Sequence, residues 1–375
     1  MQFIDLAAQQ ARIRDTIETR IRTVLDHGKY IMGPEVAELE AQLAGFSGVR
    51  EAIACASGTD ALLMSLMAYD IGPGDAVVTT PFTFIATAEV IGFLGATPVF
   101  ADIDPITYNI DPRKIDGAVD ALKKERPELT PKAIIAVDLF GLPADYDAID
   151  KVAQKLGLCV IEDAAQSFGA DYKGRRAGSL AEVACTSFFP AKPLGCYGDG
   201  GAVLTANAEL ADKMRSIRIH GQGSDKYDNI RIGINGRLDT LQASILLAKL
   251  EVFDDEIQRR QAAARRYADG LADIPNLVAP AVPDAYASVW AQYSILAKDS
   301  DHRTALQAAL KKASIPTAIY YPKPLHLQTA FADLPYERGD FPVSEEIADR
   351  IFSIPMHPYL EADQQAQVIS ALKTA

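Results

Sequence analysis

Apolar residues recur at the start of the chain with the spacing of a helix. Ile13, Ile17, Ile21 and Leu25 follow one another at four-residue steps, and Gly28 comes shortly after them. Side chains four positions apart lie on one face of a helix, and glycine often ends a helix because it adopts the left-handed conformation without a steric penalty. The pattern predicts an amphipathic helix over residues 11–28.

Continuous apolar runs then alternate with helical patterns. The runs cover residues 52–56, 76–80, 98–103, 133–139 and 159–162, and shorter ones cover 184–189 and 202–205. Helical patterns separate several of them, at 60–69, 87–94 and 145–156. Strands that lack polar alternation are buried on both faces, as in a parallel sheet covered by helices. We therefore expect an α/β fold with a parallel or mostly parallel sheet.

The last third of the chain has a different organisation. A long helical pattern covers residues 238–271, and we place a domain boundary inside it, between a large domain at 1–245 and a small one at 246–375. The small domain is expected to be α+β. Its predicted elements are a strand at 289–296, a helix at 303–313, a strand at 317–321, and helices at 344–352 and 363–372.

Composition and charge restrict the classes of partner that the protein can have. The 375 residues include 37 Lys and Arg against 50 Asp and Glu, for a net charge of −13, and 49% are hydrophobic. Such a chain can bury large cores, and its negative charge disfavours nucleic acid as a partner. No signal peptide begins the sequence and no apolar run approaches the ~20 residues that span a bilayer, so we expect a cytoplasmic protein without a membrane partner. Scattered cysteines and histidines predict no metal site.

Two segments that follow predicted strands carry candidate chemistry. Gly58 and Thr59 lie in a turn before a helix, where small residues let backbone N–H groups approach an anion such as a phosphate. Asp163 ends another strand, at the edge of an α/β sheet where ligands bind, and such a carboxylate can hold a proton on the ring nitrogen of a cofactor. Taken singly, an ordinary helix cap explains each segment better.

The third segment contains a lysine beside a glycine-rich turn. Lys192 follows the strand at 184–189, and glycines recur from Gly195 to Gly201 before another strand begins. That context differs from the strand–turn–helix of a dinucleotide site. A lysine held there can attack a carbonyl carbon if burial or neighbouring cations lower its pKa, although a single loop lysine is usually only a solvated charge.

Together the three segments supply what pyridoxal 5′-phosphate requires: an anion cradle, a carboxylate for its pyridine nitrogen and a lysine for a Schiff base. At these residues the chain resembles the DegT/DnrJ/EryC1/StrS family of nucleotide-sugar aminotransferases. The resemblance extends from Phe3-Ile4-Asp5-Leu6 through residues 28–34 to Pro355-Met356-His357-Pro358. It implies the α/β architecture of fold type I (aspartate aminotransferase-like) enzymes, with a mostly parallel seven-stranded sheet, and a homodimer with shared active sites.

The resemblance also implies roles for individual residues. Lys192 is the Schiff-base lysine and Asp163 pairs with the pyridine nitrogen, which makes them the catalytic pair. The other cofactor contacts are Gly58, Thr59 and Ser187 at the phosphate, Phe84 on the ring, Gln166 near the ring oxygen, and Asn235 from the neighbouring subunit. The substrate contacts are Tyr30, His220, Arg231, Arg237, Tyr321 and His326. From the residues alone, Asn235 also fits a polar loop before a helix, and His326 a structural histidine.

The implied reaction moves the amino group of glutamate onto a nucleotide-linked ketosugar. Residues 189–201 and 237–243 are most similar to members that aminate UDP-2-acetamido-2-deoxy-3-keto-hexuronic acids on the way to surface polysaccharide such as the O-antigen of lipopolysaccharide. A uronate carboxylate requires an arginine or several donors, for which Arg231, Arg237, Lys323 and His326 are candidates.

Three alternatives stay open. One is amination of a 4-keto-6-deoxy or 3-keto-6-deoxy nucleotide sugar. Another is sugar deoxygenation, which the presence of Lys192 and the scattered cysteines disfavour. The third is a non-catalytic regulator built on the same fold, which would have no need of Lys192, Asp163 and Gln166 together.

Overall fold

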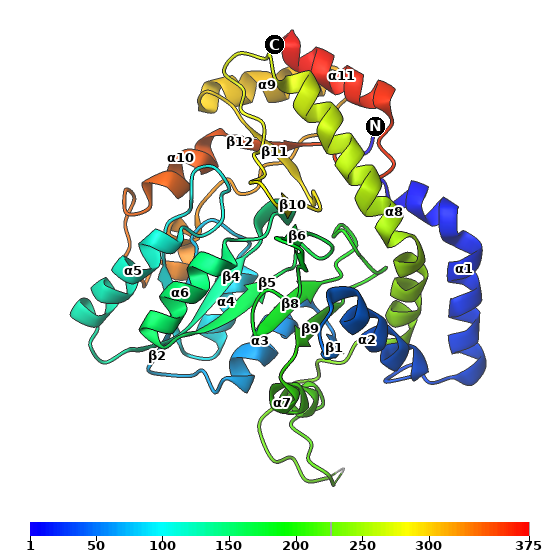
Figure 1. Cartoon of the computed structure of the whole chain (residues 1–375), viewed down its shortest axis with the longest axis vertical. Coiled ribbons are helices and arrows are strands. Elements are labelled where there is room, and N and C mark those ends of the chain that lie inside the picture. The colour runs from blue at the N-terminus through cyan, green and yellow to red at the C-terminus, as the bar shows by residue number, and fades with distance from the viewer. Residues whose placement is uncertain (226, 375) are drawn as a thin grey trace.

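A seven-stranded sheet forms the centre of the protein in a computed structural model that describes residues 1–225 and 227–374 (Figure 1). Its order is β1-β9-β8-β5-β4-β2-β3. The strands are β1 (Glu51–Cys55), β2 (Asp75–Thr79), β3 (Thr97–Phe100), β4 (Thr130–Val137), β5 (Cys159–Asp163), β8 (Val183–Ser187) and β9 (Gly201–Thr205). Strand β9 is antiparallel to both neighbours, and the other pairs are parallel. The expected mostly parallel α/β sheet is confirmed.

Both faces of this sheet are buried, which explains why its strands lack polar alternation. In β1, Ala52 and Ala54 join the hydrophobic cluster on one face, whereas Ile53 and Cys55 join the cluster on the other. Successive side chains of a strand point to opposite faces, so each face needs its own cover of helices.

Helices supply that cover. One face packs against α2 (Pro34–Ser47), α5 (Pro112–Glu125), α6 (Tyr146–Leu156) and the first half of α8 (Thr240–Leu271). The other face packs against α3 (Gly58–Ala68), α4 (Ala86–Phe93) and α7 (Ala208–Arg218). The sheet is thus the middle layer of three.

The first helix is longer than its apolar spacing predicts. Helix α1 (Leu6–His27) begins after Asp5, whose side chain accepts a hydrogen bond from the backbone N–H of Ala8 at 2.9 Å. It ends at Gly28, which has the left-handed φ of 69° that the sequence predicts for the cap. Ile13 and Ile17 pack against α8, beside which α1 lies in Figure 1.

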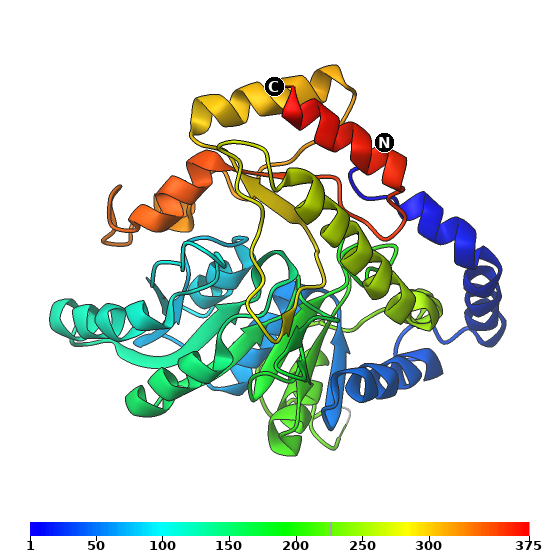
Figure 2. The same ribbon diagram turned by 45° about the horizontal axis from the view of Figure 1, so that its top comes forward.

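The C-terminal elements form a second cluster. Strands β11 (Tyr293–Leu296) and β12 (Ile351–Ile354) pair antiparallel, and they share a core with α9 (Ser300–Lys312), α11 (Ala362–Lys373) and the end of α8. Figure 2 shows α9, α10 (Pro342–Arg350) and α11, in yellow to red, grouped on one side of the sheet. The three short strands β6 (Asp171–Tyr172), β7 (Arg175–Arg176) and β10 (Tyr286–Ala287) form a separate small sheet. A domain boundary at residue 245 stays a prediction.

Two sequence predictions in this region are wrong. Residues 317–321 form no strand, and Ala318 makes only an isolated bridge to Ser353. The helix expected at 344–352 ends at Arg350, because Ile351–Ile354 pair with β11.

Helices α2, α5 and α7 were not predicted. Among the described residues, no helix is apolar over a length that would cross a bilayer.

A buried ion pair ties α2 and α7 to the sheet. The Nη1 atom of Arg218 donates to Glu40 Oε1 at 2.5 Å and to the carbonyl of Ala54 at 2.7 Å, while the N–H of Ala54 donates to Glu40 Oε1 at 2.9 Å. The side chains of Arg218 and Glu40 are only 5% and 17% exposed. Loss of either charge therefore leaves the other one buried without its partner.

We expect Arg218→Met to lower the free energy of unfolding by about 3–5 kcal/mol, because the Glu40 carboxylate would stay buried and unpaired. Urea denaturation at a fixed protein concentration measures this change. Arg14→Met is the control, since the Arg14–Glu18 pair is exposed and contributes less than about 1 kcal/mol. Equal denaturation midpoints for the two variants would contradict the interpretation.

Candidate active site

A cavity of about 660 Å³ opens at the carboxyl ends of β4, β5 and β8. Among the residues that line it are eight that the sequence predicts for the site: Gly58, Thr59, Phe84, Asp163, Gln166, Ser187, Lys192 and Tyr321. They come from segments far apart in the chain. The sheet brings all of them except Tyr321 together, because the carboxyl ends of its parallel strands share one edge. Tyr321 comes from the C-terminal region, in a segment without regular secondary structure.

One wall of the cavity is the N-terminus of α3. Ser57 caps this helix by accepting a hydrogen bond from the N–H of Asp60 at 3.0 Å. The first N–H groups of a helix have no acceptor within the helix, so those of Gly58 and Thr59 are free to bind an anion, with the helix dipole in support. A Cβ atom on Gly58 would lie 2.6 Å from the Cβ atom of Ser187. The turn therefore requires glycine in order to bring the Ser187 side chain beside these N–H groups.

Asp163 ends β5 and is buried. Its Oδ2 atom accepts a hydrogen bond from Thr87 Oγ1 at 2.8 Å, and Oδ1 accepts one from the N–H of Ala165 at 3.2 Å. Burial raises the pKa of this carboxyl group, and these hydrogen bonds and the charge of Lys192 oppose that change. A protonated nitrogen in the cavity would favour the ionised carboxylate for the same electrostatic reason.

Lys192 lies in a tightly bent loop after β8. Its N–H donates to the carbonyl of Phe189 at 2.8 Å, and a Cβ atom on Gly195 would lie 2.5 Å from the carbonyl oxygen of Pro190. Burial lowers the pKa of the Lys192 amine, against the attraction of Asp163. Its Nζ atom donates no hydrogen bond to any residue of the described ranges. A lysine in this state provides a neutral amine more readily than a solvated one.

Gln166 connects two other parts of the cavity wall. Its Oε1 atom accepts a hydrogen bond from the N–H of Phe140 at 2.8 Å, and its Nε2 atom donates to the hydroxyl of Tyr321 at 3.2 Å. Burial raises the pKa of Tyr321, which keeps its hydroxyl protonated. Phe84 is 54% exposed, with its ring centroid 6.5 Å from that of Tyr321.

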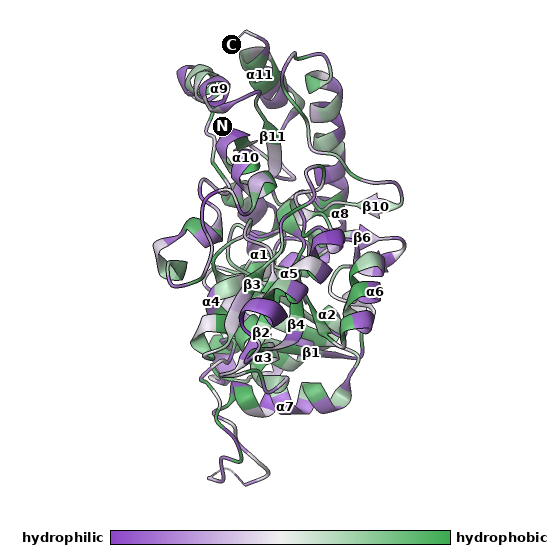
Figure 3. Cartoon of the chain, turned by 90° about the vertical axis from the view of Figure 1, so that its left-hand side faces the viewer, coloured by the Kyte–Doolittle hydropathy of each residue, from purple (hydrophilic) through white to green (hydrophobic). Residues whose placement is uncertain are grey.

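The other predicted residues lie outside this cavity. Asn235 and Arg237 line a second hollow, which shares Asp199 with the main cavity, and His220 and Arg231 line a third hollow. All four belong to the segment between α7 and α8. The tip of this segment extends away from the sheet in Figures 1 and 3, whereas its end returns to the sheet, where Arg237 bridges to Cys55 of β1. Tyr30 lies in none of these hollows and is 48% exposed.

His326 is buried and does not line the cavity. Its Nε2 atom lies 3.0 Å from Glu345 Oε1, and its ring packs edge-on against Phe341 with centroids 4.7 Å apart. Burial lowers the pKa of His326, while Glu345 opposes that change. Its role in binding substrate stays a prediction.

Among the residues of the cavity wall that the sequence did not predict for the site are Thr87, Gln292 and Tyr320. Thr87 lies in a predicted helix, and nothing in its spacing indicates that its hydroxyl faces Asp163. Tyr320 immediately precedes the predicted Tyr321, so its place in the sequence could have indicated that it lies near the site. Gln292 follows an apolar stretch near the start of β11, where no motif distinguishes it.

Comparison with known proteins shows similarity to sugar aminotransferases over nearly the whole chain. The model of the DegT/DnrJ/EryC1/StrS aminotransferase family matches residues 11–373. The UDP-2-acetamido-2-deoxy-3-oxo-D-glucuronate aminotransferase of Pseudomonas aeruginosa is 51% identical over 99% of both chains. The UDP-N-acetyl-3-dehydro-alpha-D-glucosamine 3-aminotransferase of Acidithiobacillus ferrooxidans is 43% identical over 99% of this chain and 96% of its own.

Solved structures agree in fold. A DegT/DnrJ/EryC1/StrS aminotransferase of Brucella abortus superposes with a TM-score of 0.96 at 51% identity, over 100% of this chain and 99% of that one. NtdA of Bacillus subtilis, solved with the cofactor pyridoxamine phosphate bound, superposes with a TM-score of 0.88 at 29% identity, over 99% of this chain and 82% of that one.

The cavity suits the same kind of cofactor. It combines free N–H groups for a phosphate at Gly58 and Thr59, a buried carboxylate at Asp163 and an amine of lowered pKa at Lys192. Pyridoxal 5′-phosphate is the cofactor, and the chain is an aminotransferase that belongs to the DegT/DnrJ/EryC1/StrS family.

Proposed function

We propose that this enzyme transfers the amino group of glutamate to UDP-2-acetamido-2-deoxy-3-keto-glucuronic acid and so produces the 3-amino sugar. One observation carries the proposal: the relative that is 51% identical over 99% of the chain bears the name of that activity. A relative at 43% identity is also named for amination at carbon 3 of a UDP-linked sugar. The regulator alternative is disfavoured, because Lys192, Asp163 and Gln166 all line one cavity and a non-catalytic protein has no need of that set.

When bound, pyridoxal phosphate carries the amino group between the two substrates and withdraws electrons from the carbon that loses a proton. Lys192 holds the cofactor and, once its amine is released, moves that proton. Burial of Lys192 lowers its pKa and thereby increases the fraction of neutral amine that can act as a base. Asp163 holds the proton on the pyridine nitrogen, and Thr87 orients the carboxylate.

The proposed reaction assigns the residues of the site to the cofactor and to the sugar substrate. The N–H groups of Gly58 and Thr59, together with the Ser187 hydroxyl, hold the cofactor phosphate at one end. Phe84 covers the ring, and Gln166 supports the ring oxygen. Arg231 and Arg237, which lie outside the cavity of their own chain, are the candidates for the uronate carboxylate across the subunit interface, because arginine binds a carboxylate through two parallel hydrogen bonds. Tyr321 borders the substrate side of the cavity, where its hydroxyl contacts Gln166.

The enzyme is proposed to act as a cytoplasmic homodimer. Its segment between α7 and α8 exposes Ile230 and Ile232, of which Ile232 is 86% exposed, and isolated proteins rarely leave such apolar residues uncovered together. Asn235 lies outside the cavity of its own chain, which supports a contact with the neighbouring subunit's cofactor phosphate. The same exchange would bring His220, Arg231 and Arg237 toward the neighbour's substrate, with Tyr30 near the interface.

Coupled assays with purified ketosugars test the proposed substrate. With glutamate as donor, we expect turnover of the UDP-linked 3-keto uronate and little or none of a 4-keto-6-deoxy nucleotide sugar. The product identified by mass spectrometry and NMR should carry its new amine at carbon 3. Turnover of only the 4-keto compound, or of only a 3-keto-6-deoxy sugar, would reject this substrate and leave the aminotransferase activity standing.

Lys192→Ala tests the catalytic lysine. We expect the variant to lose the visible absorption of the lysine-bound cofactor and all transfer from glutamate, because no other amine lines the cavity among the described residues. Absorption spectra and stopped-flow measurements with glutamate detect both losses. Lys155→Ala, which removes an exposed lysine paired with Asp116, should behave as the wild type. Retained amino transfer in Lys192→Ala would overturn the assignment.

Ile232→Asp tests the shared site. If this side chain is buried between two subunits, an unpaired carboxylate there costs several kcal/mol and weakens the dimer by more than about 100-fold. Sedimentation equilibrium measures the change, and amino transfer should fall with the dimer fraction. Ile106→Asp is the matched control, because Ile106 is also strongly exposed but lies outside the segment between α7 and α8. A fully dimeric Ile232→Asp protein would contradict the proposed interface.

A further inference from the structure

Gln292 is a polar side chain of the cavity wall to which the reaction assigns no role. Gln292 lies immediately before β11 and lines the active-site cavity together with Asp163, Gln166 and Lys192. Its Oε1 atom is buried and has no hydrogen-bond partner. Its Nε2 atom likewise donates to none of the residues that the structure describes. Gln292 as a whole is half-buried, and a buried amide oxygen without a partner costs about 1–3 kcal/mol, so this oxygen needs a partner that the described residues do not supply.

The backbone fixes Gln292 relative to the cofactor contacts. Its N–H donates to the carbonyl of Phe140 at 3.4 Å, and the N–H of Phe140 donates to Gln166 Oε1 at 2.8 Å. Beside it, the N–H of Val289 donates to the carbonyl of Gly141 at 2.9 Å. A Cβ atom on Gly141 would lie 2.8 Å from the backbone nitrogen of Trp290, so the two segments touch closely. A single residue, Phe140, thus connects Gln292 with Gln166.

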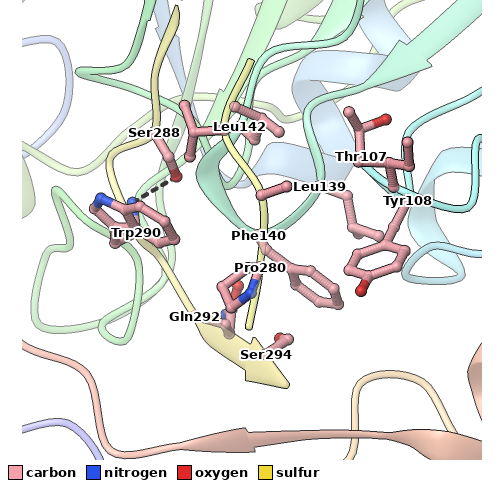
Figure 4. A pocket seen from close by; sticks show the side chains of 13 residues that line it. Thr107, Tyr108, Leu139, Phe140, Leu142, Pro280, Ser288, Trp290, Gln292 and Ser294 are labelled. Atoms are coloured by element: carbon pink, nitrogen blue, oxygen red, sulfur yellow. Dashed lines mark hydrogen bonds between the residues drawn. The ribbon is translucent and has the colours of Figure 1, made fainter. Parts of the chain in front are cut away.

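A second, much smaller cavity lies behind Gln292. Its volume is about 20 Å³, and Figure 4 shows Gln292 in its wall with Tyr108, Phe140 and Ser294. That space holds about one water molecule, which can satisfy one end of the amide and is far too small for a substrate. A larger partner can reach Gln292 only from the active-site cavity.

The cofactor and the amino donor are poor candidates for this partner. The polar groups of the cofactor already have Lys192, Asp163, Gln166 and the phosphate turn. Glutamate carries two carboxylates, which proteins bind most strongly with arginine or lysine. A neutral carboxamide offers two N–H donors and one carbonyl acceptor, which match a hydroxyl or acetamido group.

We propose that Gln292 binds the nucleotide sugar directly, through a hydrogen bond between its carboxamide and a hydroxyl or acetamido substituent of the hexose. This inference rests on the proposed function, since it requires a sugar as the amino acceptor. It makes Gln292 a determinant of specificity, because a sugar without a matching substituent makes no hydrogen bond with this carboxamide.

The test compares Gln292→Leu with the wild-type holoenzyme in two measurements. Calorimetry gives the Kd of the UDP-linked 3-amino sugar, and stopped-flow absorption gives the rate of the half-reaction with glutamate. We expect the Kd to rise at least about tenfold, the effect of one lost hydrogen bond to a buried group, while the glutamate rate stays unchanged. Gln307→Leu is the control: Gln307 is also half-buried but donates to Thr317 Oγ1, outside the cavity, and should alter neither value.

Each other result contradicts the inference in a recognisable way. An unchanged Kd in Gln292→Leu removes the sugar contact, and a slower glutamate half-reaction with an unchanged Kd assigns the residue to the donor. If the leucine variant fails to fold, Gln292→Asn keeps an amide but shortens its reach, and its Kd must also rise. A wild-type enzyme that reacts with glutamate but binds no UDP-linked amino sugar contradicts the proposed function itself, and the inference with it.

Discussion

The attraction between a buried carboxylate and a buried amine governs this site. Burial pushes Asp163 and Lys192 toward their neutral forms, and the charge of each partner opposes the change in the other. Hydrogen bonds from Thr87 and Ala165 hold the carboxylate at the end of β5. The bent loop after β8 sets the lysine opposite. The rest of the site depends on this balance, because a fully charged amine is no base and a neutral acid cannot hold a proton on a pyridine ring.

The elements and groups that follow from local pattern could be predicted. Buried strands are continuous in apolar residues, so most of the sheet could be recognised without its partners. Asp163 and Lys192 could be grouped because both follow such strands, and parallel strands end at one edge. The Gly28 cap was predictable for a similar reason, since a left-handed residue at a helix end is a local requirement.

Features that depend on distant partners could not be predicted in the same way. Residues 351 and 352 continue a predicted helix but belong to strand β12, because Ile351–Ile354 pair with Tyr293–Leu296. The position of Gln292 in the cavity wall depends on a backbone hydrogen bond to Phe140, which lies far away in the sequence. Helix α5 is a different case, because Asp111 caps it and Pro112 occupies its first position. That start signal is local and could have been used.

The antiparallel direction of β9 has a consequence for how the lysine is held. Gly201, the first residue of β9, pairs with both Ser187 and Cys55, the last residues of the two flanking strands. The chain can therefore return from β8 as a wide hairpin, without the crossover helix that a parallel strand would demand. The loop that carries Lys192 begins and ends at the same edge of the sheet, because it connects the end of β8 with the start of β9. Two strand spacings, about 10 Å, separate the ends of β8 and β1. Hydrogen-bond register therefore sets the span between the two strand ends from which the phosphate turn and the lysine loop begin.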